Sequence, residues 1–379
     1  MTNASKQAAR SILVYPLIAV LLSALCFALC TASVAQSDSG LPPSIVVHPR
    51  FGGQILGFGI DQGGTEGLLS EYVSEGGGEN LVATEAFDQT TGNIIAVLAM
   101  RDHTFDDYAT EGVVGSHVGL VLYQNVVGGV VHNYYFTVNP VNTNHFTGLW
   151  TPPMRTNYYL AGFLPNEGQP RSAVMLSSVL EQPYIYLFTS NVAQNTFSQL
   201  VPYNNGNIGC CPAFAYDGKL NDAFLAGDNG SPTSVPILAT INLTTGAIHE
   251  VNGAGVGNPN GAAIDSLTDT VAITTPGGPF TFPMVQFFNL NTQSGNSFVP
   301  PSNNVGGDVE FDALHRLFIV AASDGFNNSI LEYDVNGNLR QQITGGVLNN
   351  LLTCCTLNPN TRTGFGLGRD LLTIVSFSY

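Results

Sequence analysis

The sequence predicts an all-β protein built from similar hairpins that follow one another along the chain. One phrase recurs at Asp88, Asp217, Asp265 and Asp312: an apolar run, the Asp, a polar turn and a second apolar run. The last three acids lie 48 residues apart (217 to 265) and 47 residues apart (265 to 312), and Asn358 continues the series. A period of this length, made of strands and turns, is typical of the blades of a β-propeller.

The composition also favours strands over long helices. Charged residues make up only 10% of the chain, which contains 42 glycines. Long helices need runs of strong helix formers, whereas Gly, Asn and Asp supply the backbone angles of tight hairpin turns. We therefore expect strands and short turns throughout the folded part.

The N-terminus has the pattern of a secretory signal peptide, which we assign to residues 1–35. Lys6 and Arg10 precede an apolar run over residues 12–30, and the small residues 33–35 form a cleavage site. The apolar run is longer than the usual length of about 7–15 residues, so an uncleaved N-terminal membrane anchor is the alternative. We expect a secreted, extracellular protein.

The remaining residues 36–379 are predicted to form one domain, because repeated all-β folds run long as a single unit. Second hairpins, such as the one from Ile237, follow most of the Asp phrases, and two hairpins make a four-stranded blade. We predict six blades, which begin near Leu81, Thr147, Pro212, Gly261, Gly307 and Thr353. The segment 45–73 would close the ring by pairing with the last blade; seven blades are the alternative, if this segment forms a blade of its own.

The charge balance excludes some classes of partner. The chain has 27 acidic and 11 basic residues, and removal of Lys6 and Arg10 with the signal leaves a net charge of −18 (9 minus 27). Nucleic acids and anionic membranes need a basic surface, so we expect neither as a partner. The expected partner is an unidentified protein or small molecule, and the expected state is a monomer.

Two pairs of adjacent cysteines stand out. Cys210 and Cys211 precede the third blade, and Cys354 and Cys355 open the sixth, where the innermost strands of the blades begin. In an exported protein we expect these thiols to be oxidised. Because a disulfide needs Cα atoms within about 7 Å, a bond within each pair is favoured over one across the channel. Cross-channel bonds and free thiols stay open as alternatives.

The mature part has sequons for N-glycosylation at Asn229, Asn242 and Asn327; Pro232 weakens the first, and the other two lie in polar turns. In a eukaryotic host we expect both to carry sugar on surface loops.

The repeats, once aligned, resemble those of a known group of propellers. The phrase PNGAAIDSLTDTVAI over residues 259–273 is similar to blade repeats of the six-bladed regucalcin–gluconolactonase, NHL and strictosidine-synthase-like group. It is also similar to YVTN-type surface propellers, which are seven-bladed. The resemblance covers nearly all of the mature chain and implies the fold; this architecture hosts lactonases, esterases and pure binding platforms.

The gluconolactonase-like resemblance implies a Ca²⁺ ion held by Glu, Asn and Asp from different blades. Asn260 matches the Asn motif of that family and Asp308 lies near its Asp position. The first blade offers Glu79 or Glu85, neither at the expected spacing. The third blade carries Cys-Cys-Pro where the family has another Asn. A hard cation prefers six or more oxygen ligands, so this set would need water and backbone carbonyls as well.

No complete catalytic set is recognisable from residue types and spacing. The seven histidines are scattered, and no nucleophile elbow is present. We therefore expect a non-catalytic binding module that uses the face around the central channel. The alternative is a calcium-dependent lactonase or esterase, and a third possibility is a redox-sensitive protein that uses the paired cysteines.

Overall fold

The computed structural model describes much of the folded part of the chain and leaves the expected signal peptide, residues 1–35, outside the described residues. Between residues 101 and 203 the strands are described without their side chains. The described residues are 44–61, 64–74, 80–103, 111–114, 118–127, 130–138, 146–150, 158–165, 172–179, 182–191, 196–203, 213–217, 219–220, 222–228, 236–242, 244–245, 247–251, 259–275, 284–292, 294–298, 305–323 and 327–379.

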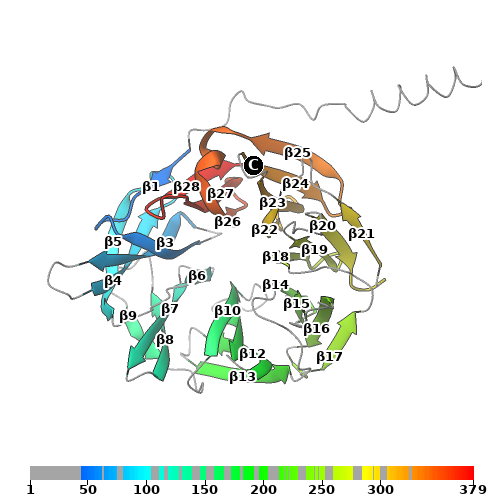
Figure 1. Cartoon of the computed structure of the whole chain (residues 1–379), viewed down its shortest axis with the longest axis horizontal. Coiled ribbons are helices and arrows are strands. Elements are labelled where there is room, and N and C mark those ends of the chain that lie inside the picture. The colour runs from blue at the N-terminus through cyan, green and yellow to red at the C-terminus, as the bar shows by residue number, and fades with distance from the viewer. Residues whose placement is uncertain are drawn as a thin grey trace, which may run out of the picture. The chain divides into compact units, whose positions relative to one another are not determined.

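The described residues form seven four-stranded antiparallel sheets (Figure 1). Each of the first three sheets is built from four consecutive strands. The first contains β2 (Gln54–Ile60), β3 (Glu66–Ser74), β4 (Asn80–Asp88) and β5 (Ile94–His103). The second contains β6 (Glu111–Val114), β7 (Val118–Val127), β8 (Val130–Val138) and β9 (Phe146–Trp150). The third contains β10 (Tyr158–Pro165), β11 (Ser172–Val179), β12 (Gln182–Asn191) and β13 (Thr196–Tyr203).

The next three sheets repeat this plan. The fourth contains β14 (Ala213–Asp217), β15 (Asp222–Asp228), β16 (Pro236–Asn242) and β17 (Ile248–Val251). The fifth contains β18 (Gly261–Asp265), β19 (Thr270–Thr275), β20 (Met284–Asn289) and β21 (Ser294–Phe298). The sixth contains β22 (Val305–Asp312), β23 (Leu317–Ser323), β24 (Asn328–Asp334) and β25 (Leu339–Thr344).

The seventh sheet combines the two ends of the folded chain. A short 3₁₀ helix, η2 (Gly346–Asn350), leads into β26 (Leu351–Asn358), β27 (Thr363–Gly368) and β28 (Ile374–Ser378). The fourth strand is β1 (Val46–Val47), which pairs antiparallel with β28 so that Val46 faces Val375 and Val47 faces Ile374. The outer edge of this sheet therefore comes from the N-terminal end of the domain.

The first strands of the sheets contact one another in chain order. β2 contacts β6, β6 contacts β10, and the series continues through β14, β18, β22 and β26, which contacts β2 again. This arrangement of four-stranded antiparallel sheets is propeller-like (Figure 1). Of the residues described, no helix is long and apolar enough to cross a membrane.

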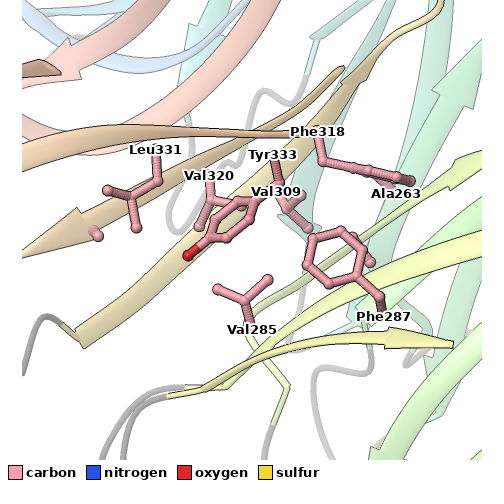
Figure 2. Packing of buried hydrophobic residues seen from close by; sticks show 10 residues of the cluster. Ala263, Val285, Phe287, Val309, Phe318, Val320, Leu331 and Tyr333 are labelled. Atoms are coloured by element: carbon pink, nitrogen blue, oxygen red, sulfur yellow. The ribbon is translucent and has the colours of Figure 1, made fainter. Parts of the chain in front are cut away.

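The core lies between neighbouring sheets. Phe287 on β20 packs against Phe318 on β23 and Tyr333 on β24, with ring centroids 5.3 Å and 5.4 Å apart. Figure 2 shows these aromatic side chains gathered between the fifth and sixth sheets with Val285 and Val309. Such packing needs strands that are apolar on both faces, and all residues of β19 are buried.

The described residues form seven sheets, whereas six blades were predicted. Of the segment 45–73, which was expected to pair with the last blade, only β1 pairs with β28, and the part from Gln54 onward contributes to β2 and β3 of another sheet. Seven sheets are the number that the seven-bladed alternative requires.

The error arose at Asp88. Asp88 ends β4, the third strand of its sheet, whereas Asp217 ends a first strand. Both acids cap a hairpin turn in the same way, so the phrase does not separate the two kinds of hairpin. Asp88 Oδ1 accepts the backbone N–H groups of Thr90 and Thr91, each at 2.8 Å. The predicted starts near residues 81 and 147 accordingly fall inside β4 and β9.

Candidate functional site

The acids of the repeated phrase cap the turns that follow the first strands of the sheets. Asp217, at the end of β14, accepts the backbone N–H groups of Lys219 at 2.9 Å and Leu220 at 3.1 Å through Oδ1. The three later members of the series cap their turns through the same side-chain oxygen, Asp265 to Leu267, Asp312 to His315 and Asn358 to Asn360. A side-chain acceptor at this position stabilises a tight turn. We call these four segments the inner turns.

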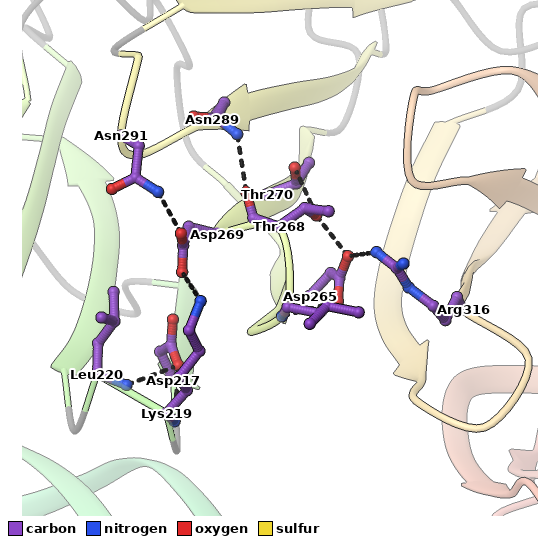
Figure 3. Close-up of polar contacts among 11 residues, drawn as sticks. Asp217, Lys219, Leu220, Asp265, Thr268, Asp269, Thr270, Asn289, Asn291 and Arg316 are labelled. Carbon is purple, nitrogen blue, oxygen red and sulfur yellow. Dashed lines mark hydrogen bonds and ion pairs between the residues drawn. The ribbon is translucent and has the colours of Figure 1, made fainter.

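Ion pairs connect the inner turns of neighbouring sheets. Arg316, in the inner turn of the sixth sheet, donates to the Oδ2 atom of Asp265 in the fifth. Lys219 in the fourth sheet lies with its Nζ atom 3.6 Å from Oδ1 of Asp269 in the fifth. Figure 3 shows these two ion pairs on either side of the inner turn of the fifth sheet. The three turns are therefore neighbours, at the same end of the strands in their sheets.

The connections continue into the seventh sheet. The Tyr379 hydroxyl donates to Asp312 Oδ2 at 3.0 Å, and the guanidinium of Arg362 lies 5.5 Å from the centre of the Tyr379 ring. Arg362 also donates to Glu332 Oε2 at 3.1 Å. Burial and the carboxylate of Asp312 raise the pKa of Tyr379, so its hydroxyl remains a donor at any physiological pH.

A last set of contacts links the seventh sheet to the first. The Asn358 side chain donates to Gln89 Oε1 at 2.8 Å and to the backbone oxygen of Gly64 at 3.2 Å. Gln89 in turn donates to the backbone oxygen of Asp61 at 2.9 Å. Sequence reasoning found the capping residues but missed Gln89, Arg316 and Tyr379, because their partners lie far away in the sequence.

Three of the inner turns carry an exposed leucine. Leu220, Leu267 and Leu314 have 40%, 64% and 61% of their surface exposed and lie in the turns of the fourth, fifth and sixth sheets. Lys219, His315 and Arg316 also reach solvent in these turns, while their carboxylate partners are buried. We call this surface, formed by residues 217, 219–220, 265–269 and 312–316, the inner-turn face.

His315 is held in a fixed orientation at this face. Its Nδ1 atom lies 2.7 Å from Oδ2 of the buried Asp312. This contact turns Nδ1 toward the carboxylate and leaves Nε2 on the other side of the ring, an orientation that is also common in enzyme sites.

The predicted metal ligands lie at the other end of the first strands. Asn260 immediately precedes β18, and Asp308 lies within β22. The two are close, because a Cβ at Gly261 would contact Asp308 Oδ1 and lie 2.8 Å from the backbone nitrogen of Val309. Glu79, the third predicted ligand, falls outside the described residues.

The carboxylate of Asp308 already has backbone partners. Its Oδ1 accepts the N–H of Val309 at 2.9 Å, and the N–H of Cys355 from the seventh sheet also donates to it. Burial raises the pKa of Asp308 to about 7. Within the described part of the chain, no cluster of three or more His, Cys, Asp and Glu side chains could hold a metal ion. Of the three predicted ligands, Asn260 and Asp308 are described, and Gly261, the neighbour of Asn260, lies against Asp308; a metal site at these residues stays a prediction.

The second cysteine pair lies beside this carboxylate. Cys354 and Cys355 are on β26, and the register with β27 shifts between Cys354 and Thr356. Cys210, Cys211 and the side chain of Cys354 lie outside what the structure describes, so the pairing of the four cysteines stays a prediction.

The two sequon asparagines have different surroundings. The amide nitrogen of Asn242 donates to Asp222 Oδ1 at 2.7 Å, and its oxygen accepts the N–H groups of Thr244 and Thr245. Asn327 is exposed at the start of β24. Because N-glycosylation modifies the amide nitrogen, the turn at Asn242 competes with it; glycosylation of either residue stays a prediction.

Comparisons with known proteins support the fold alone. No family model and no curated protein sequence matches the chain. A chain in a solved structure, described as "Crystal Structure of Mitotic Checkpoint Complex", is similar with a TM-score of 0.58 and 10% sequence identity. The similarity covers 92% of this chain and 93% of that chain. It agrees with a propeller-like fold and does not distinguish among the families that the repeats resemble.

Proposed function

We propose that this protein is a protein-interaction module that binds a partner through the inner-turn face. The observation that carries the proposal is the row of three exposed leucines on neighbouring turns. Isolated exposed apolar residues are normal, but here a leucine follows the capping acid in three successive sheets, two residues after Asp265 and Asp312 and three residues after Asp217. The structural similarity to a chain of a protein complex agrees with such a role.

The rigidity of the inner turns suits them to binding. Each leucine sits on a turn whose backbone is capped by a buried acid, and ion pairs connect the turns to one another. Binding to a preorganised surface costs less conformational entropy than binding to a mobile loop. Burial of the leucines against a partner would contribute about 25 cal/mol for each Å² of apolar surface removed from water.

The chemistry of the face selects the kind of partner. Lys219 and Arg316 lie between the leucines and reach solvent, although the whole chain has a net charge of −16. The best match is a protein segment that presents apolar side chains together with Asp or Glu. Such a segment would be repelled by most of the acidic surface and attracted here, which gives orientation as well as affinity.

The experiment has two stages. A photo-crosslinking residue at position 267 identifies the partner, and the purified partner is then titrated against variants. Leu267→Asp and Leu314→Asp should each weaken binding at least tenfold. The control is Leu372→Asp. It changes another exposed leucine, which lies in the turn between β27 and β28, at the end of the strands opposite to the inner turns. Equal affinity of all three variants and the wild type would refute the proposal.

The finer architecture and location belong to the same proposal. We infer a secreted monomer whose sheets form a closed seven-bladed ring. The contacts of β26 with β2 and the pairing of β1 with β28 support closure. The N-terminal sequence pattern supports export, and the expected consequence is a mature chain that begins near residue 36.

The second candidate is a calcium-dependent lactonase or esterase of the gluconolactonase-like type. The observation in its favour is the proximity of Asn260 and Asp308 across Gly261. A rise in melting temperature with Ca²⁺, together with lactone hydrolysis that Asn260→Ala abolishes, would establish it. Absence of both leaves the binding function standing.

A further inference from the structure

Two buried carboxyl groups hold the segment that joins β1 to the first sheet. The Arg50 N–H donates to Glu85 Oε2 at 2.9 Å. The Phe51 N–H donates to Glu71 Oε1 at 2.9 Å, and the Gly53 N–H donates to Glu71 Oε2 at 2.7 Å. We call this arrangement the carboxyl clamp. The two carboxyl groups accept hydrogen bonds from three backbone N–H groups of a segment that lies outside the described strands.

The two carboxyl groups lie close together and away from water. Glu71 is on β3 and Glu85 on β4, where Glu71 faces Ala83 and Glu85 faces Leu69, so the two are diagonal neighbours. Both residues are fully buried. Among the described residues no donor group hydrogen-bonds Glu85 Oε1, whereas a protonated Glu85 could donate from its carboxyl to Glu71. The clamp is therefore complete only when one proton is shared between the pair.

We propose that the carboxyl clamp is a pH-sensitive latch, which holds the segment 48–53 and the adjoining strand β1 in place while Glu85 is protonated and loosens them when it ionises. The latch acts on the strand that completes the seventh sheet. β1 is a two-residue strand that pairs with β28 through Val46 and Val47, and Ile45 adds two hydrogen bonds to Ser376. The anchoring of the following segment therefore matters for so short a strand.

The charged groups that act on Glu85 come from two elements. Glu71 on β3 disfavours the ionised form, and Arg50 on the joining segment favours it, while β5 presents Val97 opposite Glu85. Burial is the largest cause, and the net effect raises the pKa of Glu85 from 4.5 to about 7. A raised pKa in the closed state means that closure binds a proton. The latch is therefore strongest below pH 4.5 and weakens as the pH rises through 7.

The size of the effect follows from the two pKa values. If the open segment exposes Glu85 with its ordinary pKa of 4.5, opening becomes roughly tenfold more favourable at pH 8.5 than at pH 6.0. The change should level off above pH 8, where Glu85 is ionised in both states.

The test is hydrogen–deuterium exchange of the peptide that contains Arg50, Phe51 and Gly53, in the full mature chain. Exchange is measured at pH 6.0 and pH 8.5 and corrected for the intrinsic rates. The wild-type protection factor should fall about tenfold between the two values. Glu85→Gln, which keeps the shape and can still donate to Glu71, should show no such fall.

The control is Asp88→Asn, which removes the same charge from an exposed turn on the same strand and should behave as the wild type. A second variant, Glu71→Gln, should move the midpoint of the change to lower pH, because it removes the neighbouring charge. A wild-type protection factor that stays constant between pH 6.0 and 8.5 would overturn the proposal, even if neither Glu variant folds. So would an equal fall in Glu85→Gln.

Discussion

The capping acids of the inner turns do two things with one side chain. Oδ1 of Asp265 accepts a backbone N–H of its own turn, and Oδ2 receives Arg316 from the next sheet. The first role is local, and the repeated Asp phrase marked this residue in the sequence without revealing that its side chain caps the turn. The second role depends on a residue 51 positions away, which no local pattern could predict.

The contribution of the link can be separated from that of the cap. Asp265→Asn keeps an acceptor oxygen for the turn but removes the carboxylate that Arg316 contacts. We expect the free energy of unfolding to fall by about 1–3 kcal/mol, as measured by urea denaturation. The control Asp370→Asn alters an exposed capping acid and should change stability by less than about 1 kcal/mol. Equal effects of the two substitutions would show that the ion pair contributes nothing.

The third strands of the sheets carry a second repeat, which the sequence reading merged with the first. In the first, fifth, sixth and seventh sheets this strand ends in a buried large apolar residue followed by a polar one, at Phe87, Phe288, Tyr333 and Phe377. In two sheets the residue opposite the ring is glycine, since Gly67 faces Phe87 and Gly364 faces Phe377. Asp88 belongs to this repeat. The number of sheets was wrong because both repeats place an Asp or Asn before a hairpin turn.

These glycines should resist substitution. A Cβ at position 364 would lie 2.9 Å from Cε1 of Phe377 and closer still to other atoms of that ring. Gly364→Ala should therefore lower the free energy of unfolding by about 1–3 kcal/mol through overpacking. Combining it with Phe377→Leu should cost less than the sum of the two single substitutions. Additive effects in this double-mutant cycle would contradict the contact.

β1 gives a matched pair of neighbouring valines. Val47 is fully buried against the first and seventh sheets, whereas Val46 is 40% exposed. Val47→Ala should lower the free energy of unfolding by about 1–3 kcal/mol, and Val46→Ala should change it by no more than about 0.5 kcal/mol. Calorimetry of the two variants measures the difference. Similar small losses would mean that β1 does not contribute to the folded domain.

For the molecule as a whole, the sequence supplied the fold class and the idea that the two ends of the domain share a sheet. Asp217, Asp265 and Asp312 were enough for this, because they recur at nearly constant spacing. The sequence could not predict the inner-turn face, because it does not show whether a leucine such as Leu267 is exposed or buried. Nor could it reveal that Asp308 lies against Gly261 and Cys355.

The surface that we propose for binding is built from the same turns that link neighbouring sheets. The acids and cations that join the fourth, fifth and sixth sheets also hold their exposed leucines in a common surface. A partner that binds there would contact three sheets at once, so its affinity would depend on how the links hold the three turns relative to one another. Substitutions in the links, such as Asp265→Asn, are therefore expected to weaken binding as well as stability.

The most direct test is a methyl NMR titration of the leucine-labelled protein with the partner identified by crosslinking. Leu220, Leu267 and Leu314 should show the largest shift changes, while Leu352 and Leu372, which are exposed elsewhere, should keep their positions. Shift changes concentrated at Leu352 and Leu372, with the three inner-turn leucines unmoved, would contradict the account.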